Sequence, residues 1–173
     1  MAFWRVCFLM GQLIGLGVAQ NDGPVVPVEL RGFEEVRRAS CPWSYQEYDN
    51  FCYRVFTNQK TQSEAEADCR LEERPSGQGH LVSILSQQEN EFVTDLWLAT
   101  NPPATGDTAW IGLSDTNDSI NIGFIWSDGN VRFYTNWAES QPIEDKKCAF
   151  IRGGFWTTEY CERKMPYICK VPL

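Results

Sequence analysis

The cysteine content is the feature of this sequence that most restricts its fold. The chain has seven cysteines, and the first of them lies in an apolar N-terminal stretch. Residues 1–19 carry one arginine, an apolar centre and small residues at the end, which predicts a secretory signal peptide cleaved near Ala19. Cleavage removes Cys7, so the exported chain keeps an even set that should form three disulfides. The remaining cysteines are Cys41, Cys52, Cys69, Cys148, Cys161 and Cys169.

Length and charge narrow the function classes. A chain of 173 residues with 43% hydrophobic content can form one compact domain with a sizeable core. Its net charge of −8 would repel nucleic-acid phosphates and anionic membranes, so we expect neither as a partner. Beyond the signal no apolar run could cross a bilayer, and Gln12 interrupts the signal itself, which disfavours a retained membrane anchor. We therefore expect a secreted protein with a neutral polar or basic partner.

Residues 20–40 differ in composition from the rest of the mature chain. They contain valines, prolines and mixed charges without a sustained period, which predicts an extended N-terminal segment. Within it, the tract Glu34–Arg38 could be a short helix or a processing site, but a solvated linker is favoured. The pattern changes at Cys41, so residues 41–173 are assigned to one folded domain. Asn117 begins an Asn-Asp-Ser sequon in a polar loop and is the predicted N-glycosylation site.

Two helices are predicted in the first half of this domain. Thr61 and Glu64 have the spacing of a capping box, at the start of a helix that should run to about Arg74. Ser86 and Glu89 repeat that spacing and open a second helix. The apolar residues of the second helix recur with the helical period, so they are expected to be core: Phe92, Val93, Leu96 and Trp97.

Strands are expected mainly after the helices. Before them, residues 41–43 and 51–56 predict a hairpin that a Cys41–Cys52 bridge would hold together. The run Trp110–Ser114 predicts a strand buried on both faces, in which Gly112 allows a neighbouring backbone to approach closely. Early helices and late strands indicate an α+β fold with an antiparallel sheet. Six tryptophans lie in apolar runs and are expected to be core: Trp43, Trp97, Trp110, Trp126, Trp137 and Trp156.

A series of short motifs follows the two predicted helices in a fixed order. They are Trp110-Ile111-Gly112-Leu113, Trp126, Asn136-Trp137, Gln141-Pro142, Phe155-Trp156 and Tyr167-Ile168-Cys169. Together with the cysteine order, they resemble the long, six-cysteine form of the C-type lectin-like domain, from Cys41 to about Val171. The resemblance implies two helices, antiparallel sheets and a long loop region. It also implies the disulfides Cys41–Cys52, Cys69–Cys169 and Cys148–Cys161.

In the family that this sequence resembles, the sugar-binding members hold a calcium ion between a loop and a later strand. Their loop pattern is an acid or amide, Pro, then Asn or Asp, and their strand pattern is Asn-Asp after a Trp. Here the loop has Gln141, Pro142 and Ile143, and the strand has Thr157 and Thr158. Calcium takes about six to eight oxygen ligands, several of them carboxylates, and these replacements remove part of that set. We therefore predict no cofactor at this position, and a cis Pro142 as the family pattern implies.

Other carboxylates leave alternatives for calcium. Glu139, Glu144 and Asp145 lie near the loop, where they could form a relocated site or could only solvate the loop. Asp115 and Asp118 could keep an auxiliary calcium site of the family. Among these alternatives, the sequence favours loss of the sugar-coordinating ion.

The resemblance implies a secreted binding protein that recognises glycans of microbial or other cell surfaces. The lone histidine, His80, has no second histidine or placed nucleophile beside it, so no enzyme activity is predicted. The alternative function is a calcium-independent protein-binding or extracellular-matrix, biomineral-associated module. No oligomeric state is predicted. The predicted ligand-binding residues, of which the two threonines could instead be ordinary strand formers, are Gln141, Ile143, Glu144, Asp145, Thr157 and Thr158.

Overall fold

A computed structural model gives the structure of this protein and describes residues 40–100, 107–115, 123–131 and 134–173. The described residues belong to one compact unit, Arg37–Leu173. The predicted signal peptide, nearly all of the N-terminal segment and the Asn117 sequon lie outside the described residues, so they stay predictions. None of the helices in the described ranges is long and apolar enough to span a membrane.

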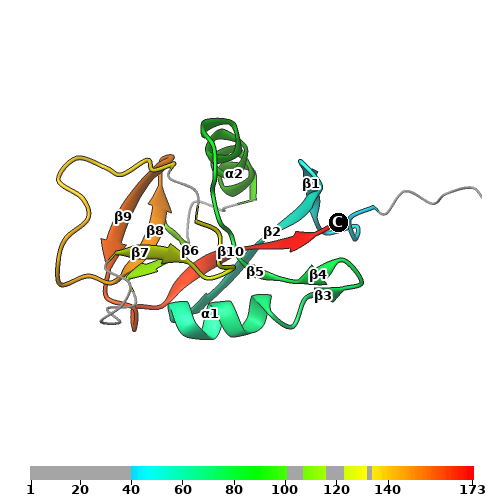
Figure 1. Ribbon diagram of the computed structural model, residues 1–173, viewed down its shortest axis with the longest axis horizontal. Coiled ribbons are helices and arrows are strands. Elements are labelled where there is room, and N and C mark those ends of the chain that lie inside the picture. Colours follow the sequence, from blue (N-terminus) through cyan, green and yellow to red (C-terminus); the bar gives the residue numbers. More distant parts are fainter. Residues whose placement is uncertain (1–39, 101–106, 116–122, 132–133) are drawn as a thin grey trace, which may run out of the picture. The chain divides into compact units, whose positions relative to one another are not determined.

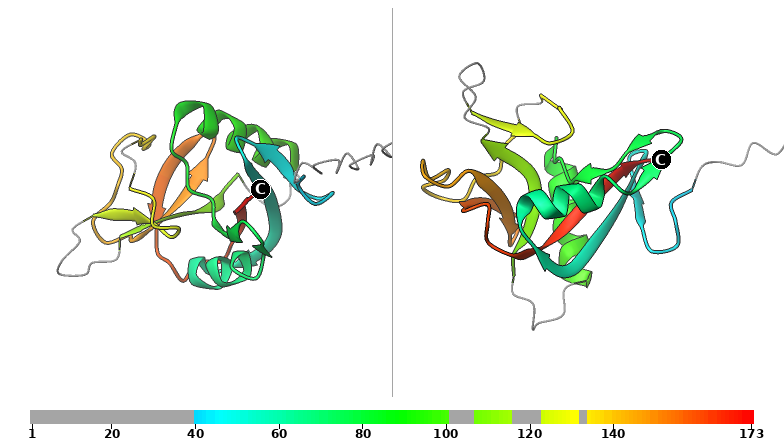
Figure 2. Two further views of the ribbon diagram at one scale, coloured as in Figure 1. Left: turned by 45° about the vertical axis from the view of Figure 1, so that its right-hand side comes forward. Right: turned by 90° about the horizontal axis from the view of Figure 1, so that it is seen from below.

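The described part has two helices, one on each side of a central sheet (Figures 1 and 2). The sheet runs in the order β1-β2-β10-β6-β8-β9; β5 also pairs with β10, and β7 with β6. The elements are β1 (Gln46–Tyr48), β2 (Phe51–Lys60), α1 (Gln62–Cys69), β3 (Glu73–Arg74), β4 (Gly77–Gln78), β5 (His80–Leu81), α2 (Gln87–Thr100), β6 (Ala109–Asp115), β7 (Phe124–Trp126), β8 (Cys148–Arg152), β9 (Phe155–Glu159) and β10 (Met165–Pro172).

The α+β class is confirmed, but the sheet is mixed rather than antiparallel. The exception is the pairing of β10 with β6, which is parallel and places Tyr167 opposite Trp110. The two strands can be parallel because β7, β8 and β9 lie between them in the chain and give it room to return. The order of helices and strands along the chain does not predict that β10 and β6 are parallel.

The central strand β6 is buried on both faces, as its sequence predicts. Ile111 and Leu113 face the core cluster that contains α2, whereas Trp110 faces the cluster that contains α1. At Gly112 a β-carbon would lie 2.6 Å from the Leu81 carbonyl oxygen, so only glycine fits there. The strand therefore contributes to the core clusters on both sides of the sheet.

The capping box at the first helix is confirmed, but the helix is shorter than predicted. The Glu64 amide donates to the Thr61 hydroxyl, and the Glu64 carboxylate accepts from the Thr61 amide at 2.9 Å. The helix ends at Cys69 rather than near Arg74, because the next residues form a small hairpin in which β3 pairs with β4. Pro75 lies in the turn of that hairpin and does not end a helix.

The first predicted hairpin is displaced by several residues. Its first strand is β1, whose partner is β2, whereas residues 41–43 lead into a turn in which the Tyr45 amide donates to the Pro42 carbonyl at 2.8 Å. Trp43 is 98% exposed, so its assignment to the core is wrong. Of the other tryptophans predicted to be core, Trp137 is partly buried against the main cluster and the rest are buried.

All three disulfides expected from the resemblance are present. They join Cys41 to Cys52, Cys69 to Cys169 and Cys148 to Cys161. The second encloses 100 residues of sequence, so on the chain-entropy model it contributes roughly 4 to 5 kcal/mol by restricting the unfolded chain.

The outer edge of β9 is covered by residues that lead into the long loop. The Trp156 amide donates to the Asn136 carbonyl at 2.8 Å, and the Ala138 amide donates to the Trp156 carbonyl at 2.9 Å. These bonds form a parallel bridge between Trp137 and Trp156. The same short segment therefore closes one side of the sheet and positions the start of the loop that contains Gln141.

Candidate functional site

The predicted site lies where residues 138–147 run beside β9. The Gln141–Pro142 peptide bond is cis, as the sequence predicts. The Gln141 side-chain oxygen accepts two hydrogen bonds from Thr158, one from the amide and one from the hydroxyl, each 2.8 Å long. The Ile143 amide donates to the same hydroxyl at 2.9 Å. Thr158 is 1% exposed, so Gln141 and Thr158 hold the loop against the strand.

These residues do not fit the calcium site that the family pattern implies. Both hydrogen-bond donors of Thr158 point at the Gln141 oxygen, which leaves that oxygen little capacity to coordinate a cation. Ile143 supplies only hydrocarbon where the family pattern has an oxygen ligand. Across the described ranges no three His, Cys, Asp or Glu side chains are grouped so that they could hold a metal ion. Neutral hydrogen bonds between the loop and the strand use the oxygen atoms of Gln141 and Thr158 that an ion would need.

The carboxylates considered for other calcium sites are dispersed or paired. Asp115 accepts a charged hydrogen bond from Lys147 at 2.7 Å, which neutralises one candidate ligand of the auxiliary site. Asp118, the other candidate, lies outside the described residues. Glu139, Glu144 and Asp145 are exposed. The arrangement of these acids is that of a solvated loop.

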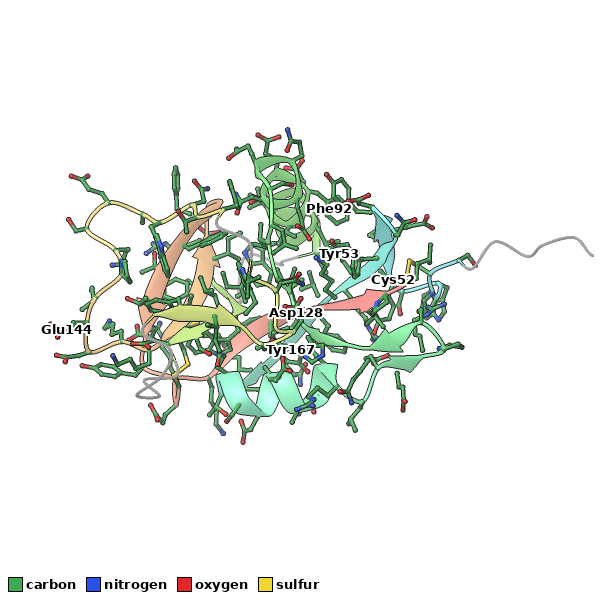
Figure 3. The ribbon with its side chains drawn as sticks, viewed as in Figure 1. Cys52, Tyr53, Phe92, Asp128, Glu144 and Tyr167 are labelled. Carbon is green, nitrogen blue, oxygen red and sulfur yellow. A yellow bond between two sulfur atoms is a disulfide. The ribbon has the colours of Figure 1, made fainter. Side chains whose placement is uncertain are left out.

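The solvent-facing part of the site is small and chemically mixed. Ile143 is 43% exposed, Glu144 and Asp145 are exposed, and Thr157 is half-buried on the outer face of β9. Glu144 lies at the tip of the loop, at the far left of the view in Figure 3. This face offers hydrogen-bond acceptors beside an apolar side chain. The assignment of these residues as ligand contacts stays a prediction.

An ion-pair cluster that includes Lys146 fixes the far end of the loop. Lys146 lies 2.9 Å from the Glu159 carboxylate, and Arg163 approaches its other oxygen at 2.7 Å. Burial raises the pKa of Glu159, but the hydrogen bonds from Lys146, from the Tyr160 amide and from Arg163 outweigh it and hold the pKa below its ordinary value. Glu159 is therefore ionised at neutral pH and ties the loop to the end of β9.

A buried ion pair that no sequence motif predicted lies in the body of the domain. The Lys170 ammonium lies 2.6 Å from Glu89, and the Tyr53 hydroxyl donates to the same carboxylate oxygen at 2.7 Å. The other Glu89 oxygen accepts from the Leu85 amide, so Glu89 does not complete the capping box predicted with Ser86. A lysine inside the apolar run of β10 was the available signal for a buried charge.

A separate recess of about 430 Å³ opens between β7 and the segment that follows it. Its walls are mostly aromatic and aliphatic, and none of the described lining residues is charged. This recess suits an apolar group better than a sugar, which needs several hydrogen-bond partners. The lining includes Phe124, Trp126, Val131, Tyr134 and Trp137.

The disulfides, the two helices and the cis-proline loop all point to one family. The model of the lectin C-type domain matches residues 58–171. The chain belongs to the C-type lectin family. This lectin-family chain is 37% identical over 159 residues to the alpha-N-acetylgalactosamine-specific lectin of Patiria pectinifera, with 83% of this chain and 92% of that one covered.

Two further similarities extend the family assignment. The mouse regenerating islet-derived protein 3-gamma is 34% identical over 173 residues, which cover 95% of this chain and 89% of the relative. Among solved structures, the C-type lectin CEL-I from Cucumaria echinata has a TM-score of 0.68 and 28% identity, over 76% of this chain and 97% of its own. The resemblance inferred from the sequence motifs is thereby confirmed.

Proposed function

We propose that this C-type lectin is a secreted, non-enzymatic protein that binds glycans without calcium. The observation that carries the proposal is the direct contact between Gln141 and Thr158, because it gives the loop its shape without a cation. The binding face comprises Ile143, Glu144, Asp145 and Thr157. Glycans of microbial or other cell surfaces are the proposed ligands.

The chemistry of this face supports sugar recognition. Sugar hydroxyls are hydrogen-bond donors, and the exposed carboxylates of Glu144 and Asp145 are acceptors. Ile143 can cover the apolar face of a sugar ring, and Thr157 offers a further hydroxyl on β9. One relative is named an alpha-N-acetylgalactosamine-specific lectin, which supports a carbohydrate as the ligand class. Three disulfides support an extracellular location.

The test is a glycan array followed by calorimetry on the best binder, with and without chelator. We expect saturable binding that chelator does not change. The double change Glu144→Gln with Asp145→Asn should weaken that binding about tenfold, which corresponds to about 1.4 kcal/mol. The matched control is Glu91→Gln with Asp95→Asn on α2, which removes the same charge from exposed positions and should leave affinity unchanged.

Two results would contradict the proposal in different ways. Binding that chelator abolishes would show that the loop does coordinate calcium. Absence of binding to any glycan would favour the second candidate, a protein-binding or extracellular-matrix, biomineral-associated module. The acidic loop tip at Glu144 and Asp145 is the feature that would serve such a module, because it suits a basic partner.

A further inference from the structure

The turn that follows the first disulfide presents one tryptophan to solvent. Trp43 is the most exposed large apolar side chain among the described residues. Its turn is fixed on one side by the Cys41–Cys52 bond and closed by the hydrogen bond from the Tyr45 amide to the Pro42 carbonyl. Exposure of an indole is unfavourable in water, and a rigid support lowers the entropy lost when a partner binds it. Trp43 therefore has the properties of a binding anchor.

A cavity of about 330 Å³ lies beside this turn. Its apolar walls come from Pro42, Pro75 and Val171, and Tyr45 also lines it. This end of the domain, where β10 ends and β3 pairs with β4, lies opposite the loop that carries Glu144 (Figures 1 and 3). The cavity is thus distinct from the proposed glycan site.

The Tyr45 hydroxyl is an unused polar group in this cavity. Tyr45 is only 8% exposed, and its hydroxyl has no hydrogen-bond partner within the described part of the chain. Burial first, and then the neighbouring Glu72 carboxylate, raise the pKa of Tyr45 above its usual range, so the hydroxyl keeps its proton. The Glu72 carboxylate and the Arg54 guanidinium are near this hydroxyl but do not meet hydrogen-bond geometry, so a ligand carbonyl in the cavity could accept a hydrogen bond from it.

The charged groups of the cavity favour a basic ligand. Glu72 and Glu73 line it, and neither forms an ion pair with another described residue. The one lining cation, Arg74, donates to the Ser40 carbonyl at 3.0 Å. The cavity therefore combines apolar walls, a tyrosine hydroxyl and a net negative charge, because two carboxylates lie beside one guanidinium.

We propose that this surface, formed by Trp43, Tyr45, Glu72, Glu73 and the two prolines of the cavity, binds a proline-rich peptide segment with a basic residue in another protein. A polyproline II segment has no internal hydrogen bonds, so its carbonyls are free to accept from the Tyr45 hydroxyl. Its proline rings match the apolar walls and pack on the indole of Trp43, as in other aromatic surfaces that recognise such segments. The basic side chain pairs with Glu72 or Glu73.

The test titrates two synthetic peptides into the complete mature protein and follows the indole signals by NMR. One is a polyproline peptide that begins with two arginines, and the other begins with two glutamates. We expect saturable binding of the first peptide only. Trp43→Ala should weaken it roughly tenfold or more, as loss of a tryptophan anchor does. Val131→Ala, an exposed apolar residue elsewhere, is the matched control and should change nothing.

Tyr45→Phe separates ligand recognition from a structural role. It removes only the hydroxyl, which has no partner, so the melting temperature should not fall while the peptide affinity falls several-fold. The proposal is overturned if neither peptide binds, if both bind equally, or if Trp43→Ala and Tyr45→Phe leave the affinity unchanged. Glycan binding should persist in both variants, so failure of this proposal is distinguishable from failure of the glycan proposal.

Discussion

Two buried polar clusters of this domain use opposite chemistry. In the body of the domain, Glu89 and Lys170 form an ion pair that is nearly inaccessible to solvent, with Tyr53 on the same carboxylate. At the loop, Gln141 and Thr158 pair through neutral hydrogen bonds. The first cluster joins α2 to β10 and β2, and the second joins the loop to β9.

Each residue of the ion pair depends on its partner more strongly than each residue of the neutral pair does. A buried charge that loses its counter-charge bears the full cost of desolvation, whereas a neutral amide or hydroxyl bears a smaller one. The Gln141–Thr158 contact thus requires no charged group to keep its polar atoms satisfied. The body of the domain requires both of its charges.

The largest effect is expected when the buried ion pair is broken. Lys170→Met should lower the free energy of unfolding by about 3 to 5 kcal/mol, because Glu89 is left buried without its counter-charge. Chemical denaturation monitored by circular dichroism measures this loss. Replacing both residues, with Glu89→Leu and Lys170→Met, should cost less than Lys170→Met alone. A double variant that is less stable than the single one would show that the pair stabilises the fold by more than the mutual neutralisation of two buried charges.

A smaller effect is expected at the neutral cluster. Thr158→Val keeps the side-chain shape but leaves the Ile143 amide without its acceptor, so stability should fall by about 1 to 3 kcal/mol. The control is Thr157→Val on the outer face of the same strand, where a change within about 0.5 kcal/mol is expected. Equal losses of stability for the two variants would contradict this prediction, because they would show that the hydrogen bond from the loop to Thr158 adds nothing to the effect of the replacement on the strand.

The salt bridges of Glu159 with Lys146 and Arg163 predict that the stability of the domain depends on pH. Because the pKa of Glu159 lies below its ordinary value, its ionised form contributes stability above the unfolded pKa, and this contribution disappears as the pH falls through the folded pKa. Glu159→Gln should therefore lower stability by less than about 1 kcal/mol at pH 7, and the difference from the wild type should shrink at acidic pH. Thermal melts between neutral and strongly acidic pH measure it. A constant difference would contradict the proposed ion pairs.

The smallest effect is expected from calcium itself. Millimolar calcium should not change the melting temperature, because a ligand that does not bind the native state cannot stabilise it. The triple change Ile143→Asp, Thr157→Asn and Thr158→Asp introduces oxygen ligands and should make the melting temperature respond to calcium. If the wild type already responds, the neutral cluster does not exclude the ion.

The sequence allowed good prediction where local chemistry decides the structure. Thr61 and Glu64 cap a helix through atoms three residues apart, and the burial of β6 follows from its unbroken apolar composition. The cis bond before Pro142 and the disulfide pairs came from the family resemblance rather than from local signals.

Prediction failed where distant segments decide the outcome. Glu89 has the spacing of a capping residue, and its amide does donate to the Ser86 hydroxyl. Its carboxylate, however, binds Lys170 and Tyr53, which are remote in sequence, and the Leu85 amide rather than the Ser86 amide. Trp43 follows Cys41 and Pro42 and is predicted to be core, yet its turn leaves the indole exposed to solvent. At the candidate site, the sequence predicts the residues of the loop and of β9, and their role as ligand contacts stays a prediction. The pairing of Gln141 with Thr158 could not be predicted, because it depends on how the loop folds over β9.

The bridge between Trp137 and Trp156 has a consequence for handling this protein in concentrated form. An uncovered outer strand exposes amides and carbonyls that recruit strands from neighbouring molecules and start aggregation. Residues 136–138 occupy the amide and carbonyl of Trp156, and the Gln141 side chain occupies the Thr158 amide, so the polypeptide covers part of its own sheet edge at that side. Attempts to redesign ligand preference by shortening the loop should leave this tripeptide intact, or the product will tend to precipitate.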